Sequence, residues 1–483
     1  MPGDDPSTGT DAPAVVWFRR DLRLADHPAL LAATGSDGRS GPGPRDVVPL
    51  FVVDPALWGP SGEPRRAWLL RSLHALDDAI GGGLVVRHGD PAEVVPALAR
   101  EVCAGQVHVS ADSGPYGRRR DDTVQAALEA GGARLVRTGS PYAVGPGSVL
   151  NGSGGPYKVF TPFSRAWLRH GWPAPAAPAD GSAGRVRWSP APGREWPAEP
   201  DLGATVLPEV GEAAAHALWQ EFLRERVREY GTAREIPARP GTSSLSAHLK
   251  YGEIHPRTLL ADLAPLAQDD RLSASSRESV ETFRSEIAWR EFYADVLWHH
   301  PGSVREYLRP QLAGMRYDDV GSGVGADRLR AWQEGRTGYP FVDAGMRQLR
   351  EEAWVHNRVR MVVASFLVKD LHVEWQHGAR FFMSLLRDGD LASNTHGWQW
   401  VAGSGTDAAP YFRVFNPVTQ GQKFDPDGDY VRRYVPELAH LTGRTTHAPW
   451  EADDGYDHGY PERVVDHAAE RVEALARLGE VTR

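Results

Sequence analysis

The first 140 residues alternate between short β-rich runs and helix-length segments, and this alternation restricts the fold more than any other feature of the chain. The β-rich runs are Val15–Phe18, Val47–Val53, Leu84–Arg87, Val107–Ser110 and Arg134–Arg137. The segments with helical length are His27–Ala33, Arg65–Ile80, Pro91–Cys103 and Arg118–Ala130. Strands that alternate with helices form a parallel sheet with helices on both faces. We therefore predict a doubly wound, five-stranded parallel α/β domain at the N-terminus.

A long connection and a helical half follow the alternating region. Residues Pro173–Pro200 are rich in proline, alanine and glycine and hold too few apolar side chains for a core, so we expect a surface linker. From about Leu207 the pattern is helical. Because 483 residues exceed what one hydrophobic core supports, we predict two domains. The predicted boundaries are a disordered tail at 1–12, the α/β domain at 13–140, an interdomain linker at 141–206 and an all-α domain at 207–483.

Composition excludes several classes of protein. The single cysteine, Cys103, rules out an internal disulfide and a cysteine-ligated iron–sulfur cluster. His372 and His377 lack the spacing of metal ligands and no HExxH motif occurs, so we expect no metal site. No apolar run is long enough to span a bilayer and the N-terminal residues have no signal-peptide features, so we expect a cytoplasmic protein without membrane partners. The net charge of −9 does not exclude nucleic acid, because phosphate binding depends on a local basic patch.

The segment from Trp354 to Pro417 combines features that a structural core does not require. Apolar residues at three- and four-residue spacing predict a helix with one buried face: Val355, Val359, Val362, Val363, Phe366 and Leu367. Asn357 and Met361 share a different face of that helix, with Arg360 beside them. Two carboxylates on a tight turn and an amide among tryptophans follow, at Asp388, Asp390, Asn394, Trp398 and Trp400. Charges this close to indoles indicate a large, flat ligand with polar edges.

Long stretches of the chain closely resemble the DNA photolyase/cryptochrome family, and within it the bacterial photolyases for cyclobutane pyrimidine dimers. The matching segments are VVWFRRDLRL, WQEGRTGYPFVDAGMRQL, HNRVRM, ASFLVKDL, DGDLASN and GWQWVAGSGTDAAPYFRVFNP, and the resemblance runs from about Ala14 to the end. It implies an antenna-binding α/β domain and a helical FAD-binding domain. The implied activity is a carbon–carbon lyase reaction in which light drives an electron from reduced FAD into a dimer flipped out of damaged DNA.

The resemblance also implies which residues hold FAD. Tyr230 lies twelve residues before Thr242-Ser243-Ser244-Leu245-Ser246, a spacing that matches the family's pyrophosphate clamp. Hydroxyls and N–H groups at the start of a helix suit an anion. The alternative is that these hydroxyls only cap the helix. Arg290 matches a residue beside the flavin phosphates, and Phe283 stands where relatives often place a tryptophan. Around the flavin ring the matching residues are Asn357, Arg360, Asp388, Asp390 and Asn394. Of these, Arg360 and Asp388 match the family's ion pair beside the flavin ring, Asp390 matches the acid on its polar edge, and Asn394 matches the residue that faces the flavin N5.

Other positions match the family's lesion and DNA contacts. Glu286 is similar to the acid that hydrogen-bonds the damaged pyrimidines, and Trp289 to the ring that packs against them. The remaining predicted contacts are Arg234, Asn357, Arg358, Met361, Trp400 and Arg413, although each arginine taken alone is more often a solvated surface charge.

Two alternatives are a cryptochrome-like light sensor and a (6-4) photolyase. In the (6-4) enzymes the positions of Asn357 and Met361 hold histidines that donate a proton, and here His356 is one residue away from that pattern. Plant-type cryptochromes tend to carry Asp, and animal ones Cys, where this chain has Asn394. No long tail follows the last predicted helix, Pro461–Leu478. We therefore favour dimer repair.

The resemblance implies two further functional groups. Trp398 and Trp375 match the inner members of the tryptophan relay that reduces the flavin; the outer tryptophan is missing, and Tyr317 or another tryptophan replaces it. In the α/β domain, Arg65, Asp112 and Lys250 match positions lining an antenna pocket, and the segment Asp112–Asp121 resembles members that bind 8-hydroxy-deazaflavin. We favour that chromophore over methenyltetrahydrofolate or no antenna, for which the three residues would be ordinary surface charges. We expect a monomer.

Overall fold

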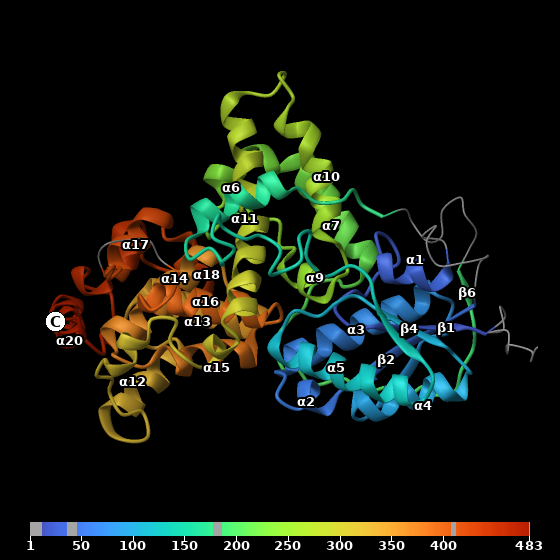
Figure 1. Ribbon diagram of the computed structural model, residues 1–483. Coiled ribbons are helices and arrows are strands. Elements are labelled where there is room, and N and C mark those ends of the chain that lie inside the picture. Colours follow the sequence, from blue (N-terminus) through green and yellow to red (C-terminus); the bar gives the residue numbers. More distant parts are fainter. Residues whose placement is uncertain (1–11, 36–45, 177–185, 407–411, 483) are drawn as a thin grey trace, which may run out of the picture.

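The computed structural model describes residues 12–35, 46–176, 186–406 and 412–482. An α/β domain and a helical domain lie side by side, and the long connection between them crosses the space where they meet (Figure 1). All but the last residue of the predicted N-terminal tail, 1–12, lies outside the described residues.

The predicted parallel sheet is confirmed, with its five strands in the order β3-β2-β1-β4-β5. The strands are β1 (Ala14–Phe18), β2 (Asp46–Val53), β3 (Val85–His88), β4 (Gln106–Val109) and β5 (Arg134–Arg137). Val15 pairs with Val48 on one side and Val107 on the other, so β1 is central. Every residue of β1 is buried, because helices cover both faces of the sheet.

The helices of this domain lie close to the predicted segments. They are α1 (Pro28–Thr34), α2 (Pro55–Trp58), α3 (Glu63–Ala79), α4 (Pro91–Glu101) and α5 (Pro115–Ala130). Successive residues of β1 point to opposite faces. Val16 and Phe18 accordingly join the core beneath α1 and α3, and Val15 and Trp17 join the core beneath α4 and α5.

The connection between the domains is more structured than the sequence indicated. Within the predicted linker, α6 (Phe160–His170) forms, and β6 (Arg187–Trp188) pairs in parallel with β2 as a sixth strand. Trp188, Trp196 and Leu202 pack against the α/β core. The predicted linker is therefore attached to the α/β domain, because a few apolar side chains and a free strand edge are enough to hold it there.

The helical domain begins with α7 and surrounds the long helix α11. Its helices are α7 (Glu212–Glu225), α8 (Tyr230–Ala233), α9 (Ser246–Tyr251), α10 (Pro256–Ala267), α11 (Ala274–His299), α12 (Gly323–Glu334), α13 (Pro340–Glu352), α14 (Asn357–Ser365), α15 (Trp375–Leu385), α16 (Leu391–Ala402), α17 (Pro417–Phe424), α18 (Asp429–Tyr434), α19 (Arg444–His447) and α20 (His467–Val481). Short turns of 3-10 helix join several of them, at η1 (Val227–Glu229), η2 (Pro301–Val304), η3 (Pro310–Gly314), η5 (Pro436–Leu438) and η6 (Pro449–Glu451). The last helix starts at His467, capped by Asp466, rather than at the predicted Pro461.

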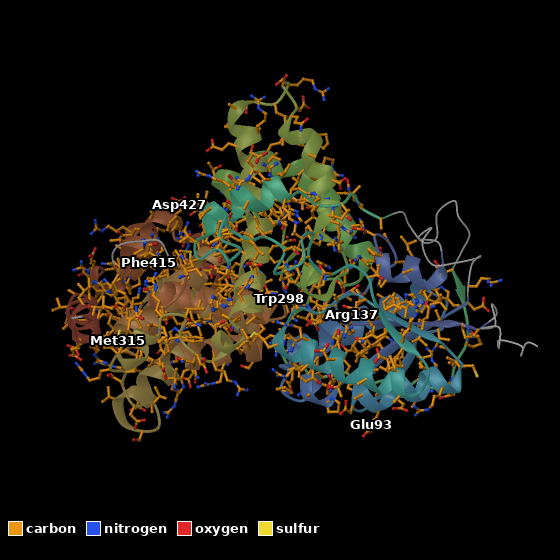
Figure 2. All side chains as sticks on the ribbon, viewed as in Figure 1. Glu93, Arg137, Trp298, Met315, Phe415 and Asp427 are labelled. Atoms are coloured by element: carbon orange, nitrogen blue, oxygen red, sulfur yellow. The ribbon has the colours of Figure 1, made fainter. Side chains whose placement is uncertain are left out.

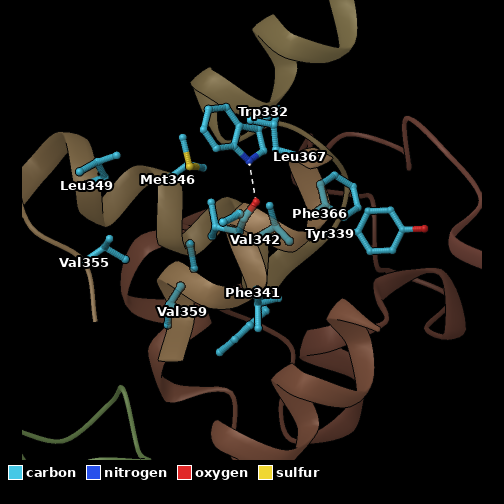
Figure 3. Close-up of a cluster of buried hydrophobic side chains, with 14 of the residues drawn as sticks. Trp332, Tyr339, Phe341, Val342, Met346, Leu349, Val355, Val359, Phe366 and Leu367 are labelled. Atoms are coloured by element: carbon cyan, nitrogen blue, oxygen red, sulfur yellow. Dashed lines mark hydrogen bonds between the residues drawn. The ribbon is translucent and has the colours of Figure 1, made fainter. Parts of the chain in front are cut away.

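The predicted buried face of α14 is confirmed, since the six apolar residues of that face are at most 1% exposed. The helix passes directly into a π-helical turn, η4 (Phe366–Asp370). Around it lies the domain core that Figure 3 shows, in which the Trp332 indole donates a hydrogen bond of 3.1 Å to the Val363 carbonyl. A Cβ on Gly345 would lie 2.5 Å from Val359, so only glycine lets α13 approach α14 this closely.

Direct contacts join the two domains. The Leu22 N–H donates to the Tyr251 carbonyl at 3.1 Å, and Gly252, with φ of 70°, lies so close to Arg20 that a Cβ would be 2.0 Å from its carbonyl oxygen. Trp298 lies between the domains, where the Arg118 guanidinium stacks 3.9 Å from its ring (Figure 2).

Candidate active site

A cavity of about 880 Å³ lies where the two domains meet. Its wall combines side chains from both: Trp17, Asp54, Trp58, Arg65, Asp112 and Tyr116 from the α/β domain, and Lys250, Trp375, Asp390 and Asn394 from the helical domain. This size and this mixture of aromatic and charged groups suit a flat chromophore with polar edges. The cavity therefore connects the predicted antenna, flavin and relay residues.

The three predicted antenna residues all line this cavity. Arg65 comes from α3, Asp112 follows β4, and Lys250 comes from α9 across the domain boundary. Burial, with the nearby Arg20 charge, lowers the pKa of Lys250 to about 7. A Cβ on Gly117 would lie 2.1 Å from the Asp112 carboxylate, so the glycine of the PYGRRRD segment makes room for that acid.

Other polar side chains in the cavity wall were not predicted. The Tyr116 hydroxyl donates to Asp54 at 2.5 Å, and burial together with that carboxylate raises the tyrosine's pKa. Arg120 makes an ion pair of 3.2 Å with Asp112. Both Tyr116 and Arg120 belong to the PYGRRRD segment, so the signal was in the sequence, but their orientation was not.

The two aspartates of the DGD turn have different partners. Arg360 binds Asp388 through one nitrogen, at 3.2 and 2.9 Å from its two oxygens, as predicted for an ion pair beside the flavin. Asp390 instead makes an ion pair of 2.7 Å with Arg20 from the α/β domain, and its other oxygen caps α16 through the Ser393 N–H. Burial raises the pKa of Asp390, but Arg20, Lys250 and Arg290 outweigh burial and hold it well below the usual range. Arg20 was missed, although it lies in the recognised segment VVWFRRDLRL.

The predicted phosphate clamp has the features of an anion site. Helix α9 starts at Ser246 without a side-chain cap, so the N–H groups of its first turn lack that partner. Ser244 has φ of 54°, a left-handed conformation that is costly for any residue other than glycine. Tyr230 and Phe283 meet edge to face at 5.1 Å beside the clamp. The hydroxyls of the loop, from Thr242 to Ser246, suit a pyrophosphate.

Arg290 and Asn394 are held by backbone carbonyls. Arg290 donates to the Pro141 and Leu249 carbonyls, each at 3.0 Å, and stacks 4.5 Å from the Tyr142 ring. Asn394 donates to the Ala379 carbonyl at 3.1 Å, which leaves its amide oxygen available to a ligand in the cavity. Both residues therefore have fixed side chains, as a cofactor contact requires.

The helix face predicted to meet the lesion carries an ion-pair network. Glu286 binds Arg234 at 2.6 Å, and Glu235 binds both Arg234, at 3.8 Å, and Arg358, at 2.8 Å. Two of the three predicted DNA-binding arginines are therefore linked to the predicted lesion-binding acid. Trp289 stacks on Phe160 of α6 at 3.7 Å and 8°, a partner that the sequence did not indicate.

Asn357 and Met361 lie together at the start of α14, as predicted. Asn357 is exposed and Met361 is half-buried, with its sulfur 3.7 Å from Arg358. His356 caps the same helix, accepting the Arg358 N–H at 3.2 Å. Burial and three arginines lower the pKa of His356 to about 4, so the imidazole is neutral near pH 7. Because its ring is 3% exposed and its Nδ1 accepts the capping N–H, this histidine is not presented to a ligand on that face.

Trp400 and Arg413 lie next to each other at the edge of the domain, with the guanidinium 5.4 Å from the indole. Residues 407–411 of the matching segment that joins them lie outside the described residues. The relative position of Trp400 and Arg413 is therefore known from their direct contact and not from the segment between them.

The predicted relay residues lie in the core of the same domain. Trp398 is 4% exposed and Trp375 1% exposed, and a Cβ on Gly378 of α15 would lie 2.2 Å from the Trp398 ring. Tyr317 hydrogen-bonds the hydroxyl of Tyr307, whose ring lies 6.0 Å from that of Trp375. Tyr307, which the sequence did not single out, therefore stands between Trp375 and the predicted terminal donor.

In the described part of the chain, no helix is long and apolar enough to cross a membrane. Within the same residues, His, Cys, Asp and Glu side chains do not gather in groups of three or more that could hold a metal ion.

Comparisons with known proteins match both halves of the chain. Residues 14–179 match a family model described as DNA photolyase, and residues 283–480 match one described as the FAD binding domain of DNA photolyase. The deoxyribodipyrimidine photo-lyase of Halobacterium salinarum is 40% identical, over 95% of this chain and 97% of that protein.

Solved structures extend the likeness to the whole fold. A bacterial class III photolyase from Agrobacterium tumefaciens has a TM-score of 0.84 and 36% identity, covering 99% of both chains. An archaeal photolyase from Sulfolobus tokodaii, solved with two FAD molecules, has a TM-score of 0.80 and 27% identity, covering 97% of this chain and 100% of its own.

Proposed function

The chain belongs to the DNA photolyase family, and from that premise we propose that it repairs cyclobutane pyrimidine dimers in DNA in a light-dependent reaction. The observation that carries this proposal is the 40% identity to a deoxyribodipyrimidine photo-lyase across almost the full length of both chains. The FAD-binding region, which matches residues 283–480, contains the clustered charges and tryptophans around α14 and α16.

Bound FAD, in its reduced form, supplies the electron that light transfers to the dimer. The α9 start and the hydroxyls of Thr242–Ser246 would hold its pyrophosphate, and Arg360, Asp388, Asp390 and Asn394 would hold its ring. The fit rests on the uncapped first turn of α9 and on the strained Ser244 beside it, since strain of this kind persists where a ligand site requires it.

Dimer cleavage requires the lesion to leave the duplex, and unstacking costs a few kcal/mol, least for a damaged pair. Glu286 hydrogen-bonds the flipped bases, and Trp289, Met361 and Asn357 pack against them. Because Glu286 is bound to Arg234 at 2.6 Å in the free protein, DNA binding exchanges part of that ion pair for contacts to the lesion and the phosphates.

The alternative of (6-4) repair is disfavoured by a specific observation. That reaction needs a proton donor at the lesion, whereas His356 is neutral near pH 7 and its Nδ1 is occupied as a helix cap. Met361 cannot donate a proton. The face suits a lesion that an electron alone can cleave.

The second chromophore is 8-hydroxy-deazaflavin, bound by Arg65, Asp112 and Lys250 in the interdomain cavity. The cavity volume of about 880 Å³ accommodates a tricyclic ring, and Lys250 beside Arg65 suits the anionic form of a phenol. Extraction of the bound chromophore followed by its absorption spectrum distinguishes a deazaflavin from a folate. A second FAD, as in the Sulfolobus tokodaii photolyase, would contradict this choice.

The function is tested with a thymine-dimer oligonucleotide. The purified protein is incubated with it under anaerobic conditions with the flavin reduced, and recovery of thymine absorbance is followed in blue light and in darkness. We expect recovery in light alone. No recovery from a protein with verified reduced flavin would overturn the proposal, and a (6-4) oligonucleotide would then be tested.

A further inference from the structure

Tyr307 makes a contact to Trp375 that extends the relay beyond its predicted residues. The two rings lie 6.0 Å apart at 83°, which is edge-to-face contact. The Tyr307 hydroxyl donates a hydrogen bond of 2.8 Å to a Glu374 carboxylate oxygen. The same hydroxyl is hydrogen-bonded to Tyr317.

Trp375 is surrounded differently from Tyr307. Its indole Nε1 is buried, and among the described residues it has no hydrogen-bond partner. Burial of the indole N–H disfavours loss of its proton on oxidation, and the radical cation that keeps the proton is a stronger oxidant than the neutral radical. Tyr307, by contrast, has a carboxylate aligned with its O–H. The pair is arranged so that the tryptophan takes an electron from the tyrosine.

Oxidation of either tyrosine requires a group that accepts its phenolic proton. Burial raises the pKa of Tyr307 far above the usual range, with contributions from Tyr317 and Glu374, and burial raises the pKa of Tyr317 to about 12. Both hydroxyls are therefore protonated near pH 7, and oxidation must release a proton. Glu374 also lines the interdomain cavity, through which the proton can reach water.

We propose that Tyr307, with Glu374 as proton acceptor and Tyr317 as the outer donor, continues the electron relay from Trp375. This inference rests on the proposed function, because its oxidant would be a Trp375 radical cation, which bound oxidised FAD would produce in light by drawing an electron through Trp398 and Trp375. One electron then moves from Tyr307 to Trp375, and the phenolic proton moves to Glu374. The products are neutral Trp375, a neutral Tyr307 radical and the carboxylic acid.

The hydrogen bond between the tyrosines supports a second transfer. Tyr317 gives one electron and its hydroxyl proton to the Tyr307 radical, which restores Tyr307 and leaves a neutral radical on Tyr317. An external reductant, such as a thiol, refills Tyr317. Tyr317 thus keeps its predicted place at the outer end, and Tyr307 supplies the missing step.

The same domain contains a matched pair for control experiments. The Tyr434 hydroxyl donates to Glu352, and the Tyr434 ring contacts Tyr430 at 5.2 Å rather than either relay tryptophan. Tyr434→Phe therefore removes an equivalent tyrosine–glutamate hydrogen bond from the same core without touching the relay.

The test is flash excitation of the holoprotein with oxidised FAD, with transient absorption and electron paramagnetic resonance to identify radicals. We expect a neutral tyrosyl radical in the wild type, and at least about a tenfold lower yield of it in Tyr307→Phe with rapid recombination from a tryptophan radical. Tyr434→Phe should match the wild type. Tyr317→Phe should still form the tyrosyl radical but shorten its lifetime several-fold.

Glu374→Gln tests the proton transfer from Tyr307. It also provides an independent test of the relay if Tyr307→Phe binds flavin poorly. It keeps a hydrogen-bond acceptor but not a base, so we expect slower tyrosyl formation and a changed effect of D₂O on its rate. A wild type that shows only tryptophan radicals, or a Tyr307→Phe or Glu374→Gln variant with wild-type tyrosyl kinetics, would overturn the inference. Dimer repair with chemically reduced FAD does not need the relay, so failure of repair in the wild type would count against the proposed function instead.

Discussion

Asp388 and Asp390 are two residues apart in one turn, but they stabilise different parts of the molecule. Asp388 is bound by Arg360 of its own domain, and its side chain is 4% exposed. Asp390 is bound by Arg20 of the other domain and is 12% exposed, with Lys250 and Arg290 as further nearby cations. The hydrogen-bonded pair of Asp388 lies within the helical domain, whereas the pair of Asp390 joins the two domains.

The difference shows how position in the fold decides what an ion pair does. A buried carboxylate with one direct partner depends on it, because desolvation leaves an unpaired charge at high cost. Both carboxylates have further arginine or lysine charges nearby, but Asp390 also accepts the Ser393 N–H as a helix cap, so it keeps a hydrogen-bond partner when its arginine is removed. We therefore expect unequal responses to matched substitutions.

The largest effect is expected for Arg360→Met, which removes the cation that is hydrogen-bonded to the buried Asp388. We expect a loss of about 3 kcal/mol, the lower end of the range for a broken buried pair, because Arg360 is itself 26% exposed. Denaturant unfolding followed by flavin fluorescence measures the change. Arg360→Met with Asp388→Leu should recover more than half of it; no recovery would mean that the charge on Asp388 is not the cause.

A second prediction concerns the pH dependence of stability in the helical domain. It depends on His356, which caps the helix that carries Arg360 and whose pKa in the folded protein is about 4. Because the unfolded chain binds this proton near pH 6.5 and the folded chain does not, stability falls as the pH drops from 6.5 towards 4. Between pH 7 and pH 5 this histidine should contribute a loss of about 2 kcal/mol.

His356→Asn is the matched control for the acid effect, because asparagine also caps a helix. The variant should flatten the dependence of unfolding free energy on pH by roughly the same 2 kcal/mol. An unchanged slope would show that other groups, such as His396 with its pKa near 4, account for the acid sensitivity.

Arg20→Gln tests the pair that joins the domains. We expect a loss of about 1.5 kcal/mol, the lower end of the range for a hydrogen bond to a charged group, because Asp390 keeps its N-cap and the nearby Lys250. Denaturant unfolding under the conditions used for Arg360→Met measures it. A loss as large as that of Arg360→Met would break the comparison.

The smallest effect, of opposite sign, is expected for Lys250→Met. Burial lowers the pKa of this lysine to about 7, so its charge opposes folding below the ordinary lysine pKa and the opposition is greatest below pH 7. Without chromophore, the midpoint of thermal unfolding at pH 7 should rise by roughly 1 °C, equivalent to about 1 kcal/mol for a chain of this length. With chromophore bound, the unfolding midpoint of the variant should no longer exceed that of the wild type, because methionine cannot pair with the anionic chromophore that Lys250 would bind.

Much of the fold could be predicted because its signals are local. The five strands of the parallel sheet and the buried face of α14 follow from hydrophobic periodicity, which depends on neighbours a few residues apart. The two-residue β6 could not be predicted, because a strand this short has no periodicity and forms only where the edge of β2 accepts it.

The sequence by itself determined the family, the fold class and the types of residue at the site, since long motifs and repeating patterns are properties of the chain. Only the tertiary structure decided which of these residues meet. It brought Arg20 to Asp390 across 370 positions, Phe160 to Trp289, and Tyr307 and Glu374 to Trp375 and Tyr317. Contacts at such separations depend on how the two domains and the helices pack, and no local pattern encodes that packing.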